Sequence, residues 1–313
     1  MPTCHPLSPR WPRLLLVVLL LMAHCSIAVQ TPAAYAANQI WYVKHDASSG
    51  GNGTSWASAF TDLQAALAEA EATDQIWVAS GVYYPTDSST LRTASFVLKN
   101  GVALYGGFVG NESQLSQRDW ELNKTILSGD IDRNDTHTNG IVIDTTGLNG
   151  DNSYHVVTAT YLDASAIIDG FVITAGRANG LNPDNLGGAI YNSNASPTIS
   201  NISFSGNFAT LGGAIFNNTS SSPTITNVSF SGNSATYGGA IYNNNSSPTI
   251  TNASFSGNSA TYDGGANYNN INSSPTITNV SFSGNSASAD GGAISNWYSS
   301  PIITHASFSG NSA

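Results

Sequence analysis

One pattern is written five times between Gly187 and Ala313, and this repeat restricts the possible folds more than any other feature. Paired glycines begin at 187, 212, 238, 264 and 291, so they recur every 25–27 residues. Because proline and phenylalanine keep the same period, we interpret the segment as a tandem structural repeat. These markers are Pro197, Pro223, Pro248, Pro275 and Pro301, and Phe204, Phe230, Phe255, Phe282 and Phe308.

The second repeat shows what each unit builds. In PTITNVSF (223–230), Ile225 alternates with Thr224 and Thr226, as side chains of a half-buried strand do. Asn227 interrupts the alternation, and asparagine tolerates the left-handed backbone that a sharp bend requires. The SGN segment (231–233) is a second turn, and another short strand follows the next glycine pair. Each unit therefore predicts three short strands and three corners.

No single unit can bury its Ile, Val and Phe side chains alone. Stacked units place like residues on one another, about 4.8 Å apart. The β-branched residues, glycines, serines and one proline per unit exclude helices in this segment. The sequence therefore predicts an all-β fold, a parallel β-helix with about 26 residues in each coil.

Two tetrapeptides alternate along the repeats. GGAI stands at 187–190, 212–215, 238–241 and 291–294, and FSGN at 204–207, 230–233, 255–258, 282–285 and 308–311. They resemble the GGA-I/L/V and F-x-x-N tetrapeptides of the polymorphic outer membrane proteins. From about residue 40 the chain is similar to the right-handed parallel β-helix proteins of the pectin-lyase-like superfamily, which implies a right-handed coil. Asn267, in place of isoleucine, and His305, at the asparagine corner, depart from the pattern.

Residues 1–37 have the features of a bacterial-type export signal. Arg10 and Arg13 precede an apolar run at 14–22, and Ala34-Tyr35-Ala36 offers a cleavage site. The alternatives are a retained membrane anchor and a lipoprotein attached through Cys25. The signal predicts a secreted or cell-surface protein without a transmembrane span in its mature chain.

Cleavage after residue 36 changes both the cysteine content and the charge. Cys4 and Cys25 are removed, so no disulfide can form in the mature chain. Two of the nine basic residues are also lost, which leaves seven against nineteen acidic residues and a net charge of −12. This surface repels nucleic acid, so we expect no nucleic-acid partner.

The sequence predicts four consecutive segments. Residues 1–37 are the signal peptide, 38–90 the N-terminal cap and first coil, 91–186 irregular coils with loops, and 187–313 the five regular repeats. Within the cap, residues 61–72 form an amphipathic helix that covers the open end of the coil, and Thr61 and Gln64 form a capping box. Stretches 109–124 and 131–154 are polar and are predicted to leave the coil as loops.

Residues suited to catalysis are scarce. From Gly187 onward there is no Lys, Arg or Glu, and Asp263 and Asp290 are the only acidic residues. A polysaccharide lyase needs carboxylates that hold Ca²⁺ and a base, and a glycoside hydrolase needs two carboxylates across a cleft. The sequence therefore favours a role without catalysis, and we expect no cofactor other than the calcium ion considered next.

Residues 91–186 contain the remaining candidates for chemistry. Asp130, Asp132 and Asn134 place oxygen atoms at alternate positions, which suits Ca²⁺, although the EF-hand pattern is not met. The alternative is a solvated acidic loop. The segment Arg118-Asp119-Trp120-Glu121 is polar and resembles a recurrent segment of secreted β-helix proteins, and we predict a structural salt bridge there.

Tyr191, Phe216, Tyr242 and Tyr268 hold equivalent positions in four repeats and form an aromatic ladder. If the isoleucines beside them face inward, the rings lie outside and offer a surface for a sugar or a protein. If the orientation is reversed, the rings belong to the core.

These observations favour a secreted or cell-surface β-helix that acts as a structural, adhesin-like passenger. An extracellular carbohydrate or a cell-surface protein is the expected partner. The alternative is a polysaccharide lyase or hydrolase with its site in residues 91–186. The sequence stops in mid-coil at Ala313, which predicts a missing C-terminal segment or a partner that covers this end.

Overall fold

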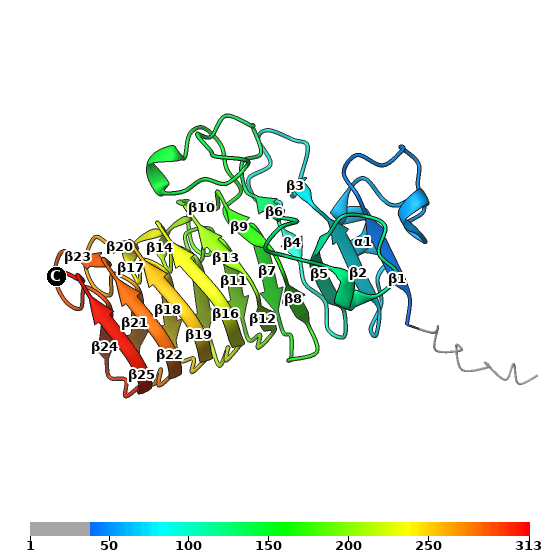
Figure 1. The fold of residues 1–313 in the computed structure, drawn as a ribbon. Helices are drawn as coiled ribbons and strands as arrows, with labels where there is room; N and C mark the ends of the chain where they lie inside the picture. Colours follow the sequence, from blue (N-terminus) through cyan, green and yellow to red (C-terminus); the bar gives the residue numbers. More distant parts are fainter. Residues whose placement is uncertain (1–37) are drawn as a thin grey trace, which may run out of the picture. The chain divides into compact units, whose positions relative to one another are not determined.

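The structure is a computed structural model that describes residues 38–313. These residues form one stack of parallel coils (Figure 1). The predicted export signal, residues 1–37, lies outside the described residues. Strands at equivalent positions pair in parallel with the next coil, as β16 does with β19 and β19 with β22. The fold class predicted from the sequence, an all-β parallel β-helix, is confirmed.

Three parallel sheets form the sides of the stack. The largest contains β1 (Ile40–Val43), β2 (Gln75–Ala79), β3 (Gly81–Tyr83), β5 (Ala103–Phe108), β6 (Thr125–Ser128), β8 (Ile167–Asp169), β9 (Val172–Thr174), β12 (Thr198–Ser200), β13 (Ser203–Ser205), β16 (Thr224–Ser231), β19 (Thr249–Ser256), β22 (Thr276–Ser283) and β25 (Ile302–Ser309). The second contains β4 (Phe96–Val97), β7 (Val157–Thr160), β11 (Ile190–Ser193), β15 (Ile215–Asn218), β18 (Ile241–Asn244), β21 (Asn267–Asn270) and β24 (Ile294–Trp297). The third contains β10 (Arg177–Ala178), β14 (Phe208–Leu211), β17 (Ser234–Tyr237), β20 (Ser259–Ala260) and β23 (Ser286–Ala287).

The asparagine corner bends the largest sheet around two sides of the coil. Asn227 lies inside β16 with a φ of 55°, and its equivalents in the other coils have φ of 52–55°. This left-handed conformation costs most residues about 1–2 kcal/mol but is tolerated by asparagine. The bend predicted from the sequence is confirmed, and His305 adopts it as well, with a φ of 52°.

Identical side chains stack along the core. The Phe204, Phe230, Phe255, Phe282 and Phe308 rings follow one another with centroids 4.6–4.9 Å apart. The first four of these rings are fully buried, as are Ile199, Ile225, Ile250 and Ile277 of the same sheet. The spacing equals the distance between hydrogen-bonded strands, so the backbone ladder and the side-chain stack reinforce each other.

A buried asparagine stack occupies the SGN corner, where the sequence predicted only a turn. Asn207, Asn233, Asn258 and Asn285 are fully buried. Each Nδ2 donates to the Oδ1 of the next asparagine at 2.9–3.0 Å. Each also donates to a backbone carbonyl, as Asn233 does to Phe204 O at 3.1 Å. The stack therefore satisfies backbone groups that the corner would otherwise bury without partners.

The backbones of neighbouring coils approach each other so closely that the glycine pair is required. Gly212 has a φ of 67°, and a Cβ atom on Gly213 would lie 2.2 Å from the Gly239 carbonyl oxygen. The coils therefore touch backbone to backbone at this corner, and no side chain fits there.

A short helix covers the first coil, but its N-terminus differs from the prediction. Helix α1 spans Leu63–Glu69, and its N-cap is Asp62, whose side chain accepts the Gln64 N–H at 2.9 Å. The predicted Thr61/Gln64 capping box is wrong, because the Gln64 side chain instead donates to the carbonyls of Pro85 and Ser95. The predicted amphipathic character is confirmed by the buried side chains of Leu63, Ala66 and Leu67, although the helix is shorter than the predicted 61–72.

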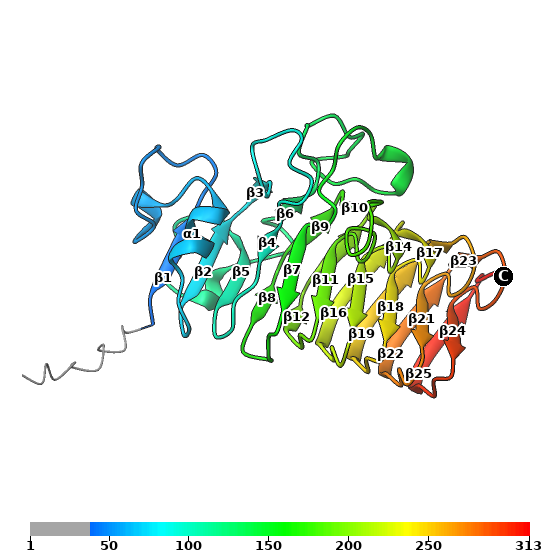
Figure 2. The same cartoon turned by 180° about the vertical axis from the view of Figure 1, so that it is seen from behind.

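The coils before Gly187 carry the long connections. Short 3₁₀ turns occur at η1 (Trp56–Ser58), η2 (Leu115–Gln117) and η3 (Thr145–Gly147). The connection between β6 and β7, which includes η3, protrudes beside β9 and β10 in both views (Figures 1 and 2). The loops predicted at 109–124 and 131–154 contain no strand, as expected.

Asn267 places a polar side chain at a core position that holds isoleucine in the neighbouring coils. It occupies the position of Ile241 and Ile294 in the neighbouring coils, is fully buried, and has no partner for its Nδ2 atom. We expect Asn267→Ile to raise the free energy of unfolding by about 1–3 kcal/mol, since an unsatisfied buried donor is removed and apolar contacts are gained. Denaturant unfolding measures the change.

Asn269→Ile is the matched control two residues further along the same strand. Asn269 accepts from Asn243 and donates to Asn296, both at 2.8 Å, so its replacement should destabilise the fold. Equal effects of the two substitutions would contradict the assignment of the Asn267 Nδ2 group as an unsatisfied buried donor.

Candidate functional site

A buried ion pair fixes the loop between β5 and β6 against the coil. Arg118 and Asp169 form a salt bridge with side chains only 8% and 11% exposed. Arg118 also donates to the Gly106 carbonyl at 3.1 Å, and Asp169 accepts from Asn201 Nδ2 at 2.9 Å and from Ser200 Oγ. The predicted salt bridge at Arg118 is confirmed. Its partner lies 51 residues away, and nothing in the sequence indicated it.

Arg118 in turn positions an aromatic ring. Its guanidinium carbon lies 5.0 Å from the centroids of the Tyr105 ring and the Trp120 ring. Because Arg118 is held by Asp169, Trp120 is fixed in place before any ligand arrives. Among the described residues, no acceptor is hydrogen-bonded to the Trp120 indole N–H.

Trp120 forms one wall of a groove of about 260 Å³. The same wall carries the exposed side chains of Glu121 and Lys124, which form no salt bridge with any described residue. The rest of the lining comes from the start of β9 and from two successive asparagine corners. These residues are Phe171, Val172, Asn201, Ile202, Ser203, Asn227, Val228 and Ser229.

The groove is lined by an aromatic ring, apolar side chains, amides and hydroxyls. These groups suit a ligand with both apolar and hydroxylated faces. Glu121 is the only carboxylate in the lining, whereas glycoside hydrolysis needs two. We define this site, with its Arg118–Asp169 support, as the Trp120 groove.

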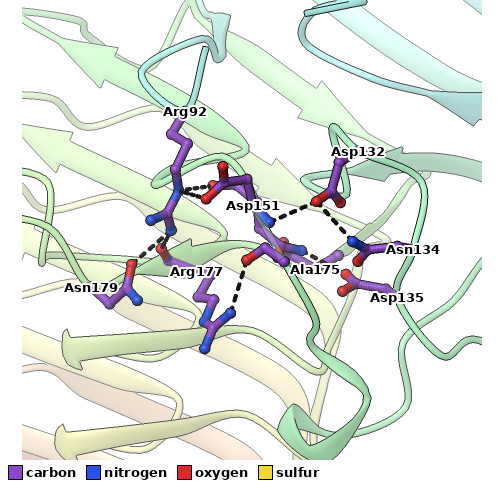
Figure 3. A network of polar contacts seen from close by, with 10 residues as sticks. Arg92, Asp132, Asn134, Asp135, Asp151, Ala175, Arg177 and Asn179 are labelled. Carbon is purple, nitrogen blue, oxygen red and sulfur yellow. Dashed lines mark hydrogen bonds and ion pairs between the residues drawn. The ribbon is translucent and has the colours of Figure 1, made fainter. Parts of the chain in front are cut away.

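The calcium candidate lies in the protruding loop between β6 and β7 (Figure 3). Asp130 accepts the backbone N–H groups of Asn134 and Asp135 at 3.0 and 3.3 Å. Asp132 accepts from Asn134 Nδ2 and from the Asp151 N–H, both at 2.8 Å. Each carboxylate therefore already orders the loop. In residues 38–313, no group of three His, Cys, Asp or Glu side chains is arranged to hold a metal ion. The Asp130, Asp132 and Asn134 calcium site stays a prediction.

Two arginines connect the same loop to the coils (Figure 3). Arg92 donates to the carbonyls of Asn152 at 2.7 Å and Arg177 at 3.0 Å, and its Nε lies 3.7 Å from Asp151 Oδ1. Arg177 donates to the Gly150 carbonyl at 3.0 Å. Charge-assisted hydrogen bonds therefore fix the C-terminal part of the loop, at residues 150–152.

Burial raises the pKa values of two aspartate side chains in this loop. It raises the pKa of Asp135 to about 6, and the nearby Asp130 and Asp132 charges act in the same direction. Hydrogen bonds from Asn149 N and Asn152 Nδ2, both 2.6 Å long, oppose this shift. Burial and the adjacent Asp132 likewise raise the pKa of Asp130. Carboxylates that crowd together away from water disfavour their charged forms.

The aromatic ladder lies outside the main core but is covered. Ile190, Ile215 and Ile241 point inward and are fully buried, so the neighbouring rings face away from them. Even so, Phe216, Tyr242 and Tyr268 are only 3–8% exposed, because they pack with Leu186, Leu211 and Tyr237 in a second apolar cluster. Tyr191 is half-buried, and its ring stacks between those of His155 and Phe216. Ligand binding by this ladder stays a prediction.

Comparison with known families supports the resemblance carried by the tetrapeptides. Residues 227–246 and 279–296 match the Chlamydia polymorphic membrane protein (Chlamydia_PMP) repeat. Both segments begin at an asparagine corner and extend through the glycine pair into the next strand of the second sheet. A comparison with curated proteins finds no match.

Two solved structures match over most of the length of this chain. Pectin methylesterase PemA from Erwinia chrysanthemi shares 14% sequence identity, with a TM-score of 0.39, over 82% of this chain and 67% of the esterase. Pectate lyase Pel9A shares 11%, also with a TM-score of 0.39, over 86% of this chain and 78% of the lyase. Within residues 38–313, no helix combines the length and the hydropathy that a bilayer-crossing segment requires.

The raised pKa of Asp135 makes a pH prediction. The folded state holds this proton to about pH 6, whereas the unfolded chain releases it near the ordinary value of 3.8. The contribution of Asp135 to the free energy of unfolding should therefore fall as the pH rises from about 4 to about 6, and stay level above that. Asp135→Asn should remove this slope in unfolding curves measured across the range.

The control is Asp290→Asn, which changes an exposed acid in the regular repeats. It should leave the pH dependence as in the parent chain. An Asp135→Asn profile parallel to the parent profile between pH 4 and 6 would show that Asp135 is not the group responsible.

Proposed function

We propose that the chain is a secreted or cell-surface β-helix that binds an extracellular ligand without catalysis, as an adhesin-like passenger. The Trp120 groove is the main support for this proposal, since it combines an aromatic ring in contact with Arg118, two exposed charged side chains and polar lining groups. The regular coils beside it extend the surface with exposed or half-buried threonine, serine and asparagine side chains.

The repeat match and the composition support the cell-surface location. The matched repeat is named for a membrane protein of Chlamydia, and the sequence begins with the features of an export signal. Residues 38–313 are built by the stacking of coils and present a long, rigid surface. Rigidity favours adhesion, because a preformed surface loses little conformational entropy on binding.

A polysaccharide lyase or hydrolase with its site in residues 91–186 is the second candidate. One observation favours it, since Glu121 and Lys124 flank the same groove and could supply one acid and one base. A hydrolase would need a second carboxylate in the groove, and a calcium-dependent lyase would need a set of cation ligands.

Binding of the labelled full chain to cultured mammalian cells tests the proposal. Trp120→Ala should weaken binding at least about tenfold, as truncation of a central aromatic residue does at other interfaces. Leu122→Ala is the matched control, because Leu122 is 81% exposed in the same loop and does not line the groove. Cells treated with periodate or with protease distinguish a carbohydrate partner from a protein partner.

Incubation of the same preparation with polygalacturonate tests the second candidate. We expect no release of unsaturated or reducing sugars. Release that is abolished by Glu121→Gln or Lys124→Met would overturn the non-catalytic proposal. Equal cell binding by the parent chain and by the Trp120→Ala variant would show that the Trp120 groove is not the binding site.

A further inference from the structure

Four tyrosines from two neighbouring coils form a continuous set of ring contacts, which we call the tyrosine cluster: Tyr237, Tyr242, Tyr262 and Tyr268. The ring centroids of Tyr242 and Tyr268 are 5.1 Å apart, those of Tyr268 and Tyr237 are 5.5 Å apart, and those of Tyr237 and Tyr262 are 5.3 Å apart. The cluster therefore runs without a break from two buried rings to the exposed ring of Tyr262.

The two ends of the cluster differ in their access to water. Tyr242 and Tyr268 are 8% and 7% exposed, and burial raises the pKa of both phenols. Tyr262 is 51% exposed and lies in a bend outside the strands. Loss of an electron from a phenol is coupled to loss of its proton, so an oxidised cluster is stabilised most easily at Tyr262, where water accepts the proton.

Within residues 38–313, no sulfur-containing side chain competes with these tyrosines. Both cysteines and both methionines of the sequence lie in residues 1–25, so residues 38–313 contain neither. Thiols and thioethers are the usual first targets of biological oxidants. In this part of the chain, tyrosine and tryptophan are the most easily oxidised side chains.

We propose that Tyr237 and Tyr262 are an oxidative cross-linking site, at which hydrogen peroxide and a peroxidase join two neighbouring coils through a dityrosine bond. Each phenol loses one electron and its hydroxyl proton. The two radicals couple through ring carbons ortho to the oxygens, and the two ring hydrogens shift to restore both hydroxyls. The peroxide O–O bond breaks, accepts two electrons and two protons, and yields two water molecules.

The geometry favours this pair over the others in the cluster. The Tyr237 and Tyr262 rings are nearly parallel, at 21°, and one of them can move because it is exposed. Tyr242 also stacks on its partner, at 26°, but is held between Phe216 and Tyr268. Tyr237 and Tyr268 are inclined at 58°. The product would close a loop across one coil and constrain the unfolded chain as a disulfide does.

The test treats the dilute full chain with hydrogen peroxide and a peroxidase, after Cys4 and Cys25 have been alkylated so that they cannot form a disulfide with the same change in mass. We expect dityrosine fluorescence in the monomer fraction and a mass lower by two hydrogens. Since no Lys or Arg follows Arg177, pepsin rather than trypsin is used to map the linked peptide. The peptide should join Tyr237 to Tyr262, and the linked chain should unfold at a higher denaturant concentration.

Tyr237→Phe and Tyr262→Phe should each abolish the monomer product, while both keep the ring stack. Tyr161→Phe is the control, because Tyr161 is 74% exposed and makes no ring contact with a described aromatic residue. Linkage between another pair, linkage only between molecules, or no dityrosine would each overturn the proposal. An equal yield of dityrosine from the chain oxidised in denaturant would also overturn the proposal. It would show that the folded stack does not direct the coupling.

Discussion

Every coil of this protein depends on backbone hydrogen bonds to the coils before and after it, because its strands pair in parallel between coils. This single constraint forces equivalent residues to lie on one another. It explains why phenylalanine follows phenylalanine in the core and asparagine follows asparagine at the SGN corner, with side-chain amides that repeat the backbone pattern. It also explains the glycine pair, since a Cβ atom at Gly213 would collide with the carbonyl of the next coil.

The periodic part of the fold was predictable because its local and long-range signals agree. The period of 25–27 residues, the strand alternation around Ile225 and the bend at Asn227 all express one coil geometry. The buried state of Asn233 was not predictable in the same way, since SGN reads equally well as an exposed turn. The cap of α1 was misassigned for a related reason. Thr61 and Asp62 both suit an N-cap, and contacts with residues 85 and 95 decide the role of Gln64.

The candidate site was predictable only in part, because its components come from segments that follow no period. The polar segment around Arg118 indicated a salt bridge, but Asp169 as its partner depends on how the loop returns to the coil. Likewise, the direction of the aromatic ladder follows from the inward isoleucines. Its burial depends on Leu186, Leu211 and Tyr237, which belong to another side of the coil. The pattern of a single sequence predicts on which face of a strand a residue lies. It does not predict which distant residues pack over that face.

The division of charge along the chain follows from the same constraint. A residue in a regular coil lies about 4.8 Å from its equivalents, so a repeated lysine or aspartate would stack like charges on one another. Uncharged amides, hydroxyls and aromatic rings avoid this repulsion and stabilise the stack instead. Charged side chains that form specific contacts are therefore found mainly outside the regular repeats, in the loops that carry Arg92, Arg118 and Asp135. In such a fold, the regular coils supply rigidity and length, and recognition is built from the irregular loops that return to contact them.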